Sequence, residues 1–251
     1  MDFFEMRTAA DLLRGTDQES DRKLRLTRLG ELAGIIMHEV NQPLGAIVSS
    51  ADAALRWLDR DTPNVAAATR SIERIRAVAS KSGRTIVDLQ SLSSDFLIDF
   101  EERPLNAVID EAIQISGAQI SHADVKMDLS LDANWPIARI NTDLLLQVML
   151  NLIRNAIDSM LGAPDRLRTL NIRTFTRSAS VVVEFEDNGL GLPEGSAAHL
   201  FDPLYTTKKG GMGLGLALCR RVVVAHGGSI EARSNPSYGA TFAVSLPRVE
   251  P

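Results

Sequence analysis

The sequence predicts a multidomain chain, with an all-α antiparallel helical hairpin followed by an α+β sandwich. Three observations lead to this fold class. Apolar residues recur at steps of three and four in two long runs before residue 100, helices and strands mix after it, and Arg103-Pro104 marks the change. A length of 251 residues allows one large domain or two small ones. We expect a signalling helix or linker over 1–23, a helical domain over 24–100 and a second domain over 101–251.

Composition and charge exclude several classes of protein. The 27 Lys+Arg and 32 Asp+Glu give a net charge of −5, which argues against a general nucleic-acid binder with a basic face. A single cysteine, Cys219, forms no internal disulfide and no structural zinc site. Residues 1–20 lack the features of a signal peptide, and no stretch approaches ~18 consecutive apolar residues. We therefore expect a cytoplasmic chain without direct membrane insertion, which can still be part of a larger sensor protein.

The first domain is expected to contain two long helices joined by a short turn. Residues 24–58 and a second run ending near Phe96 both follow a heptad spacing of apolar residues. Between them lies a turn at 59–64, in which Thr62 is expected to cap the second helix and Pro63 to occupy its first position. A lone hairpin leaves an apolar stripe on each helix, which a second hairpin would cover in a four-helix bundle. We predict a homodimer through residues 24–100; packing against the rest of the same chain is the alternative.

The second domain is expected to layer helices on one sheet. The 141–161 segment is the strongest helix, with Asn141 or Thr142 as its N-cap. A loop rich in Gly, Pro and Lys is expected over 187–212. The other expected helices are 105–120 and 213–226, and the expected strands are 125–131, 169–177, 180–186, 228–234 and 240–246.

His38 and Glu39 form the first candidate site. His38 lies about 200° around the helix from the core position Ile36, so its side chain is expected to face outward. A neutral imidazole is a nucleophile, and an adjacent acid can orient it or take its proton. Pro43 cannot donate a helical hydrogen bond, so the helix is expected to bend just after the site. Taken alone, such a motif is more often a solvated surface histidine beside an unrelated glutamate.

A second candidate site lies on the 141–161 helix. Asn151 and Asn155 are four residues apart, so both amides emerge on one face of the helix. Neutral oxygen ligands on a rigid helix suit Mg²⁺, which also binds phosphate oxygens. Arg154 is near enough to contact a phosphate. Surface Asn pairs also occur by chance.

Two glycine-containing segments complete the set. Asp187 ends a strand and can accept from an exocyclic amine, while Gly189 and Gly191 let the backbone approach a flat ring. A plain Asp-Asn-Gly turn is the alternative for this segment alone. The run from Lys208 to Leu216 leads into a helix start, which presents backbone N–H groups and a positive dipole end to a phosphate.

In this order and spacing, the last three segments resemble the N, G1, F and G2 boxes of the GHKL ATP-binding fold. The segment from Met37 to Leu44 resembles the H box of sensor histidine kinases, and its HEVNQPL form resembles PAS-linked oxygen-sensor kinases. The likeness covers about residues 27–247. It implies a protein-histidine kinase that autophosphorylates His38 from ATP and passes the phosphoryl group to an Asp in a response regulator receiver domain. An upstream sensor domain is expected outside this chain.

The resemblance also implies the role of each residue. Glu39 is the acid/base partner of His38, and Gln42 stands where many relatives orient water for phosphatase action, so that activity stays open. Asn151 and Asn155 hold Mg²⁺, and Asp187 binds the adenine amino group. The implied ATP-binding residues are Asn151, Arg154, Asn155, Asp187, Gly189, Gly191, Phe201, Thr207, Lys208, Gly211, Gly213, Leu214, Gly215 and Thr241.

Two other functions share part of this pattern. A GHKL ATPase that drives a conformational clamp needs the nucleotide boxes but no exposed His-Glu pair. A non-catalytic dimeric scaffold needs the hairpin alone. The sequence leaves open the input signal, the cognate response regulator and whether phosphorylation occurs within or between protomers.

Overall fold

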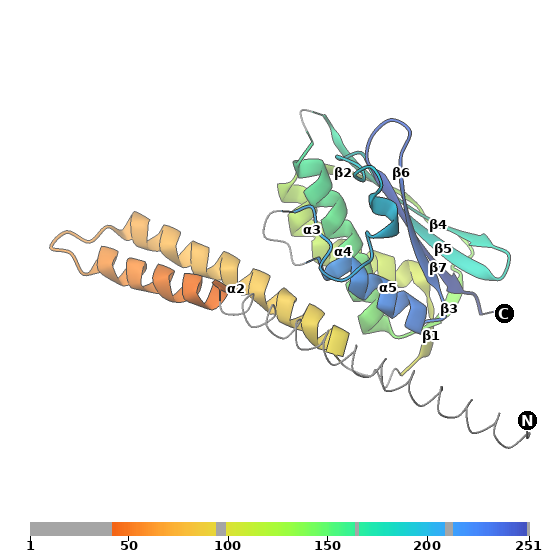
Figure 1. Cartoon of the computed structure of the whole chain (residues 1–251), viewed down its shortest axis with the longest axis horizontal. Coiled ribbons are helices and arrows are strands. Elements are labelled where there is room, and N and C mark those ends of the chain that lie inside the picture. Colours follow the sequence, from red (N-terminus) through yellow and green to blue (C-terminus); the bar gives the residue numbers. More distant parts are fainter. Residues whose placement is uncertain (1–41, 94–98, 164–165, 209–212, 250–251) are drawn as a thin grey trace, which may run out of the picture. The chain divides into compact units, whose positions relative to one another are not determined.

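The structure is a computed structural model that describes residues 42–93, 99–163, 166–208 and 213–249 (Figure 1). The chain divides into two compact units, Met1–Gln90 and Ser91–Pro251. Unit 1 holds the helical hairpin, and unit 2 holds the sheet and its helices, which confirms the predicted fold class.

Unit 1 is formed by a helix over residues 42–58 and by α2 (Val65–Ser93). The predicted cap of the second helix is wrong by two residues. Asn64, not Thr62, caps α2, because its Oδ1 accepts from the Ala67 backbone N–H at 3.0 Å and its carbonyl accepts from Ala68. Pro63 therefore precedes the cap, where its lack of an N–H is equally harmless.

The two helices of unit 1 bury small side chains and leave large ones exposed. Ser50, Ala54, Ala67 and Ala68 are all buried. In contrast, six large apolar side chains of the predicted heptad runs and their flanks stay in solvent. They are Leu44, Val48, Leu55, Leu58, Val65 and Ile72, with exposed fractions from 44% to 65%.

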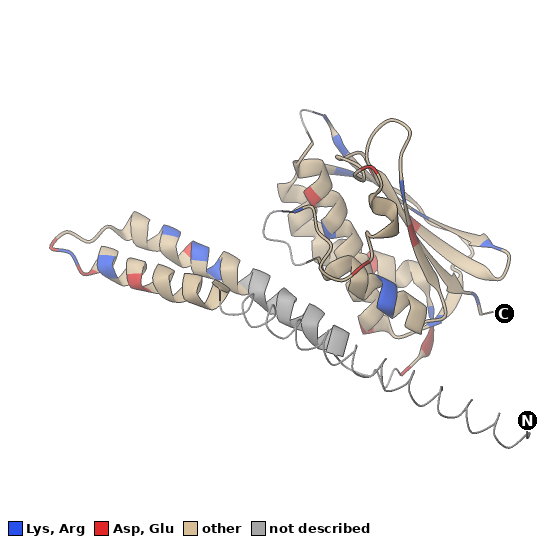
Figure 2. Cartoon of the chain, viewed as in Figure 1, with Lys and Arg blue, Asp and Glu red and all other residues tan. Residues whose placement is uncertain are grey.

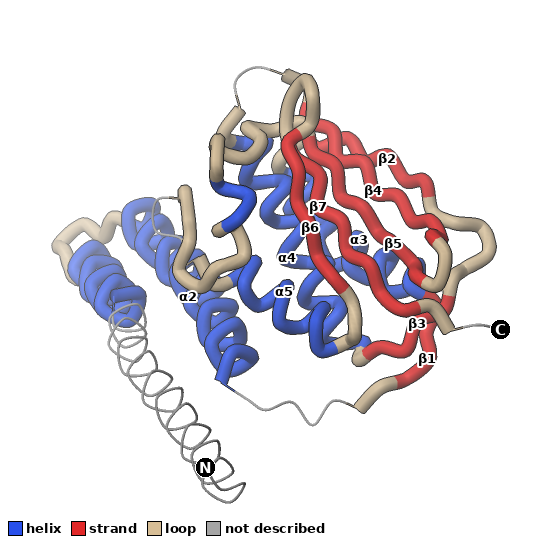
Figure 3. Tube along the Cα trace, turned by 45° about the vertical axis from the view of Figure 1, so that its right-hand side comes forward, coloured by secondary structure: helices blue, strands red, loops and turns tan. Residues whose placement is uncertain are grey.

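Unit 2 is a five-stranded sheet with helices on one of its faces (Figure 3). The strand order is β2-β4-β5-β7-β6; β2 and β4 are parallel and every other pair is antiparallel. A separate antiparallel pair joins β1 to β3. The strands are β1 (Glu101–Pro104), β2 (Val125–Ser130), β3 (Ile137–Ile140), β4 (Arg168–Arg177), β5 (Ser180–Asp187), β6 (Ser229–Ser234) and β7 (Ala240–Pro247). The helices are α3 (Leu105–His122), α4 (Thr142–Leu161), the short 3₁₀ helix η1 (Ser196–Ala198) and α5 (Gly215–Ala225).

The helix ends follow from side-chain hydrogen bonds. Asn141 is the N-cap of α4, as one of the two predicted alternatives had it, and its Oδ1 accepts from the Leu144 N–H at 3.0 Å. His122, which lies beyond the helix expected over 105–120, is the last residue of α3.

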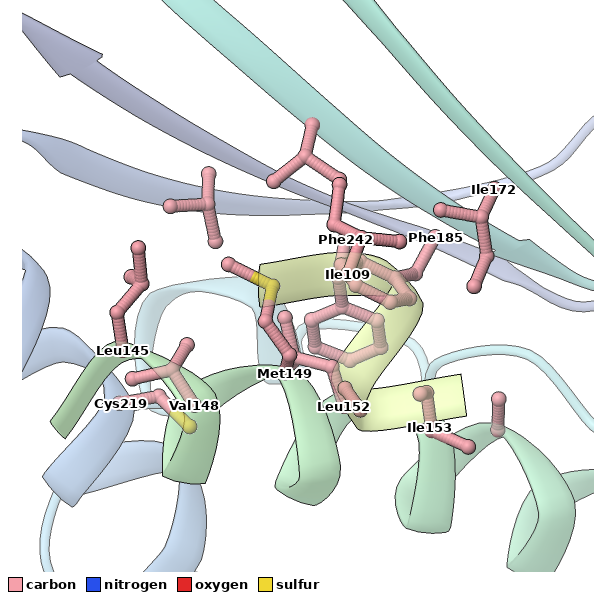
Figure 4. Close-up of a cluster of buried hydrophobic side chains, with 14 of the residues drawn as sticks. Ile109, Leu145, Val148, Met149, Leu152, Ile153, Ile172, Phe185, Cys219 and Phe242 are labelled. Carbon is pink, nitrogen blue, oxygen red and sulfur yellow. The ribbon is translucent and has the colours of Figure 1, made fainter. Parts of the chain in front are cut away.

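The core of unit 2 lies between α4 and the sheet (Figure 4). Met149 and Leu152 of α4 are buried in the same cluster as Phe185 of β5 and Phe242 of β7. These two phenylalanines face each other across neighbouring strands. Helix α4 is long and apolar enough to span a membrane by length and composition, but half of its apolar window is buried inside the protein. Its hydropathy is therefore that of a core helix.

Acidic and basic residues are interspersed along the described helices and strands (Figure 2). On β5, Glu184 has a 9% exposed side chain and accepts from Arg173 of β4 and Arg233 of β6. Burial raises the pKa of Glu184, but the two guanidinium groups outweigh it and the pKa lies below its usual value. Arg173 and Arg233 therefore form ion pairs within the sheet.

Candidate functional site

One face of α4 carries the polar residues expected to bind phosphates. Asn151, Arg154, Asn155 and Asp158 are three or four residues apart, so they share a face of the helix. Lys208, from the loop before α5, reaches this face: its Nζ donates to Asn155 Oδ1 at 2.9 Å and to Asp158 Oδ2 at 2.7 Å. The structure thus brings Lys208, an implied ATP-binding residue, into contact with Asn155, an implied Mg²⁺ ligand.

Asn151 lies deeper than Asn155. It is only 6% exposed, whereas Asn155 is half-buried and its oxygen contacts the exposed Lys208 ammonium. The Asn151 Oδ1 accepts from Arg154, and its Nδ2 donates to the sulfur of Cys219 in α5. Of the two asparagines, Asn155 is therefore the better placed to meet a ligand.

Asp187 forms a buried acceptor at the end of β5. It is 3% exposed, and its Oδ1 accepts from the Gly189 N–H at 2.8 Å and the Ser159 hydroxyl at 3.3 Å. Burial raises the pKa of this carboxyl, against hydrogen bonds from Gly189, Ser159 and Ala240 that lower it. Because a carboxylate has about four acceptor positions, these three donors leave room for an amino group of a ligand.

The glycines around Asp187 are required by close packing. A Cβ at Gly189 would collide with Ser159 and the Met160 N–H of α4. Gly191 and Gly239 have φ of +78° and +79°, and a Cβ at Gly239 would collide with the Asp187 carbonyl. The loop after β5 is thereby held against α4 and the β6–β7 turn, which fixes the walls around the carboxyl.

A backbone hydrogen bond joins the two ends of the loop before α5. The Leu204 N–H donates to the Gly213 carbonyl at 3.0 Å, and Gly213 has φ of +65°. Phe201 and Tyr205 pack against the hydrophobic core. Thr207 is exposed on the loop between these points.

Helix α5 begins next to the polar face of α4. Leu214 is its N-cap, is buried and offers no side-chain hydrogen bond, so the first N–H groups of α5 have no side-chain cap. A Cβ at Gly215 would lie 2.7 Å from Asn151 Nδ2. An anion beside this helix end would be stabilised by those N–H groups and by the helix dipole.

Thr241 lies on the other side of the sheet from the Asp187 carboxyl. It pairs with Glu186 on β5, and side chains alternate between faces along a strand. Its hydroxyl donates to Asn235 Oδ1 at 2.6 Å, and Asn235 Nδ2 donates to the Asp187 carbonyl. Thr241, one of the implied ATP-binding residues, thus reaches Asp187 through Asn235.

Three predicted residues lie outside the described residues, namely His38, Glu39 and Gly211. Gln42 begins the described part of the first helix and is exposed. Sequence reasoning missed Ser159 and Asp158, although both follow Asn155 at helical spacing on α4. It also missed the contact of Cys219 with Asn151, which depends on how α5 packs on α4.

The donor atoms on α4 suit a hard cation. Among the described residues no group of three or more His, Cys, Asp or Glu side chains could hold a metal by itself. Asn155 Oδ1 and Asp158 Oδ2 already hold the ammonium of Lys208. Two oxygens fit Mg²⁺, which binds proteins through one or two side chains and completes its shell with water and phosphate oxygens.

Comparison with known proteins shows what this arrangement is similar to. Residues 140–250 match the family described as "Histidine kinase-, DNA gyrase B-, and HSP90-like ATPase". The C4-dicarboxylate transport sensor protein DctS of Rhodobacter capsulatus is 34% identical over 247 residues, which are 98% of this chain and 38% of DctS. The sensor protein FixL of Bradyrhizobium diazoefficiens is 34% identical over 232 residues, or 90% of this chain and 45% of FixL.

A solved structure covers both units. The structure of histidine kinase ThkA in complex with response regulator protein TrrA matches this chain with a TM-score of 0.70 and 22% sequence identity. The match covers 93% of this chain and 66% of the solved chain. This likeness establishes the fold of hairpin and sandwich. The chain spans less than half the length of DctS and FixL.

Proposed function

We propose that this chain, which forms the catalytic core of a sensor histidine kinase, phosphorylates its own His38 from ATP and passes the phosphoryl group to an aspartate of a response regulator. The observation that carries this is the pairing of a buried acceptor, Asp187, with the polar face of α4 beside the start of α5. One end suits an adenine amino group and the other suits phosphates. The matched family implies ATP binding by residues 140–250.

Each part of the site has a role in holding the nucleotide. Asp187 accepts from the adenine amine, and Gly189 and Gly191 let the ring approach the backbone. The N–H groups at the start of α5 and Lys208 neutralise phosphate charge, which is the main contribution that a protein makes to phosphoryl transfer. We expect Thr207, Gly211 and Gly213, from the segment before α5, to contact these phosphates.

We assign Mg²⁺ to Asn155, with Asp158 beside it. The ion would supply charge neutralisation on the phosphate oxygens. Lys208 donates to both oxygens, so we propose that its ammonium moves from them to a phosphate oxygen when Mg²⁺ binds there. Asn151 then supports the site from within rather than holding the ion.

The hairpin supplies the phosphate acceptor. An imidazole nitrogen of His38 attacks the γ-phosphorus, the bond to the β–γ bridging oxygen breaks, and ADP leaves while Glu39 takes the imidazole proton. The exposed apolar side chains of unit 1, such as Leu55 and Ile72, support a homodimer through residues 24–100. We propose that this dimer acts in the cytoplasm, where ATP is, as part of a longer sensor protein, with the receiver domain of a response regulator as its partner.

The test is incubation of the full chain with γ-³²P-ATP. We expect acid-labile label on the wild-type chain and none on the His38→Gln chain. Hydrolysis of ATP without protein label would instead indicate an ATPase clamp, and absence of ATP binding by calorimetry would indicate a scaffold.

Mixing two inactive chains tests how the dimer works. A His38→Gln chain retains the nucleotide site, and an Asn155→Ala chain retains the acceptor histidine. Label that appears only in the mixture shows that phosphorylation crosses the dimer. A mixture without label shows that it occurs within one protomer.

A further inference from the structure

The amide of Asn151 is held on three sides inside unit 2. Its Nδ2 donates to Cys219 Sγ at 3.2 Å, its Oδ1 accepts from Arg154 Nη2, and Gly215 covers it. A Cβ at Gly215 would lie 2.7 Å from Nδ2 and 2.9 Å from Oδ1. The cysteine is 1% exposed and belongs to the buried core cluster (Figure 4).

Chemistry fixes which end of this amide faces which neighbour. A guanidinium group only donates hydrogen bonds, so the atom of Asn151 that meets Arg154 is the oxygen. The nitrogen must then face Cys219, whose sulfur can accept. A buried amide nitrogen without an acceptor carries a desolvation cost, which the cysteine removes.

We propose that Cys219 is a positioning residue of the kinase: its sulfur fixes the orientation of the Asn151 amide, whose oxygen in turn holds the Arg154 guanidinium toward the terminal phosphates of ATP. This rests on the proposed function. Arg154 shares the α4 face with Asn155 and Asp158, on which Lys208 lies. The orientation of a single buried amide thereby links α5 to a phosphate-binding side chain on α4.

The alternative is that Cys219 only fills space, since a buried cysteine behaves as a small apolar residue. Two substitutions of Cys219 distinguish positioning from space filling, because the two ideas predict opposite orders for how closely the variants resemble the wild type. Cys219→Ser keeps an acceptor but loses size and apolar character. Cys219→Val keeps the apolar character and about the size, but removes the acceptor. Positioning predicts that the serine variant resembles the wild type, and space filling predicts that the valine variant does.

The experiment measures the affinity of the full chain for a non-hydrolysable ATP analogue and for ADP by calorimetry, with EDTA present. We expect the wild type and Cys219→Ser to agree within about twofold in the ratio of the two affinities. We expect Cys219→Val to lose about tenfold for the triphosphate relative to the diphosphate. An unchanged ratio in Cys219→Val, or an equal loss in Cys219→Ser, would overturn the proposal.

A double-mutant cycle distinguishes the proposed effect of Cys219 from a general loss of structure. In an Arg154→Gln background, Cys219→Val should have no further effect on the affinity ratio, because the cysteine acts through that arginine. Additive losses would overturn the proposal. The side-chain amide signals of Asn151 by NMR give a readout without nucleotide: they should persist in Cys219→Ser and broaden by exchange in Cys219→Val. A wild-type chain that binds no nucleotide would overturn the proposed function itself, and with it the role of Arg154.

Discussion

The two units bury opposite kinds of side chain. In unit 1 the buried residues of the described hairpin are small, such as Ala54 and Ala68, and large ones such as Leu55 are 65% exposed. In unit 2 the buried residues are large, with Phe185 and Met149 almost inaccessible to solvent. Burial of large apolar side chains is the main stabilising contribution to a fold. Unit 2 therefore buries its large apolar side chains within one chain, whereas unit 1 leaves exposed an apolar face that we propose a second chain covers.

The largest expected effect is therefore on the assembly of unit 1. Leu55→Glu places one charge from each protomer in the proposed dimer interface, at a cost of several kcal/mol for each buried, unpaired charge. We expect a monomer in analytical ultracentrifugation at micromolar concentration, with unchanged affinity for ATP. Ile115→Glu is the matched control, since Ile115 is 56% exposed on α3 of unit 2. A Leu55→Glu chain that remains dimeric would show that this apolar face is not the interface.

Asp187→Asn should instead weaken ATP binding by unit 2 and leave the assembly of unit 1 unchanged. The Gly189 N–H and the Ser159 hydroxyl demand an oxygen, so the new amide turns its NH₂ group toward the adenine amine. We expect ATP affinity to fall by at least about 100-fold, because two donors then face each other.

The fold of the Asp187→Asn chain should survive. Burial raises the pKa of Asp187, so its ionised form is penalised in the folded state, and the neutral amide removes that penalty. Calorimetric titration with ATP and thermal melting measure the two effects. Asp128→Asn, at an exposed position of β2, is the control. Loss of both binding and melting transition would mean that Asp187 is a structural residue.

A smaller effect is expected from His226, a buried histidine of unit 2. The Asn141 N–H donates to its Nε2 at 3.0 Å, its Nδ1 lies 2.7 Å from the Val222 carbonyl, and its ring meets the edge of Phe100. Only a neutral imidazole can make both hydrogen bonds, and burial lowers the pKa of His226 below 6.5. The unfolded chain binds the proton more readily, so this contribution to stability is complete above about pH 6.5 and declines as the pH falls below it.

Urea unfolding measures that decline. The slope that one such group adds is at most about 1.4 kcal/mol per pH unit. His226→Gln keeps a donor and an acceptor without titrating, so its stability should depend less on pH between about 5 and 7. His122→Gln, at an exposed position, should keep the wild-type slope. Equal slopes in all three chains would rule out a neutral, buried His226 as their source.

Sequence reasoning succeeded where a pattern was long and local. Helix α4 and strands β4 and β5 followed from their periodicity. The strands β1 and β3 were missed, because each has four residues and they pair across α3 and β2. The contacts of Lys208 with Asn155 were out of reach for the same reason: they join segments whose proximity only the folded chain determines.

The smallest effect concerns the turn in unit 1, where sequence and structure named different caps. Asn64→Ala removes the acceptor of the Ala67 N–H and should cost the first turn of α2 about 1 kcal/mol, because N-cap side chains contribute about that much. Hydrogen exchange at Ala67 by NMR should then accelerate about fivefold.

Asn64→Asp keeps the acceptor and should leave the exchange of Ala67 near the wild-type rate. Thr62→Ala should also have no effect, although threonine before proline reads as the better helix start in the sequence. If Thr62→Ala accelerated exchange and Asn64→Ala did not, the helix would begin where the sequence alone placed it. The local choice of cap between two suitable residues is thus decided by which side chain reaches the open N–H groups of α2, and this experiment measures that choice directly.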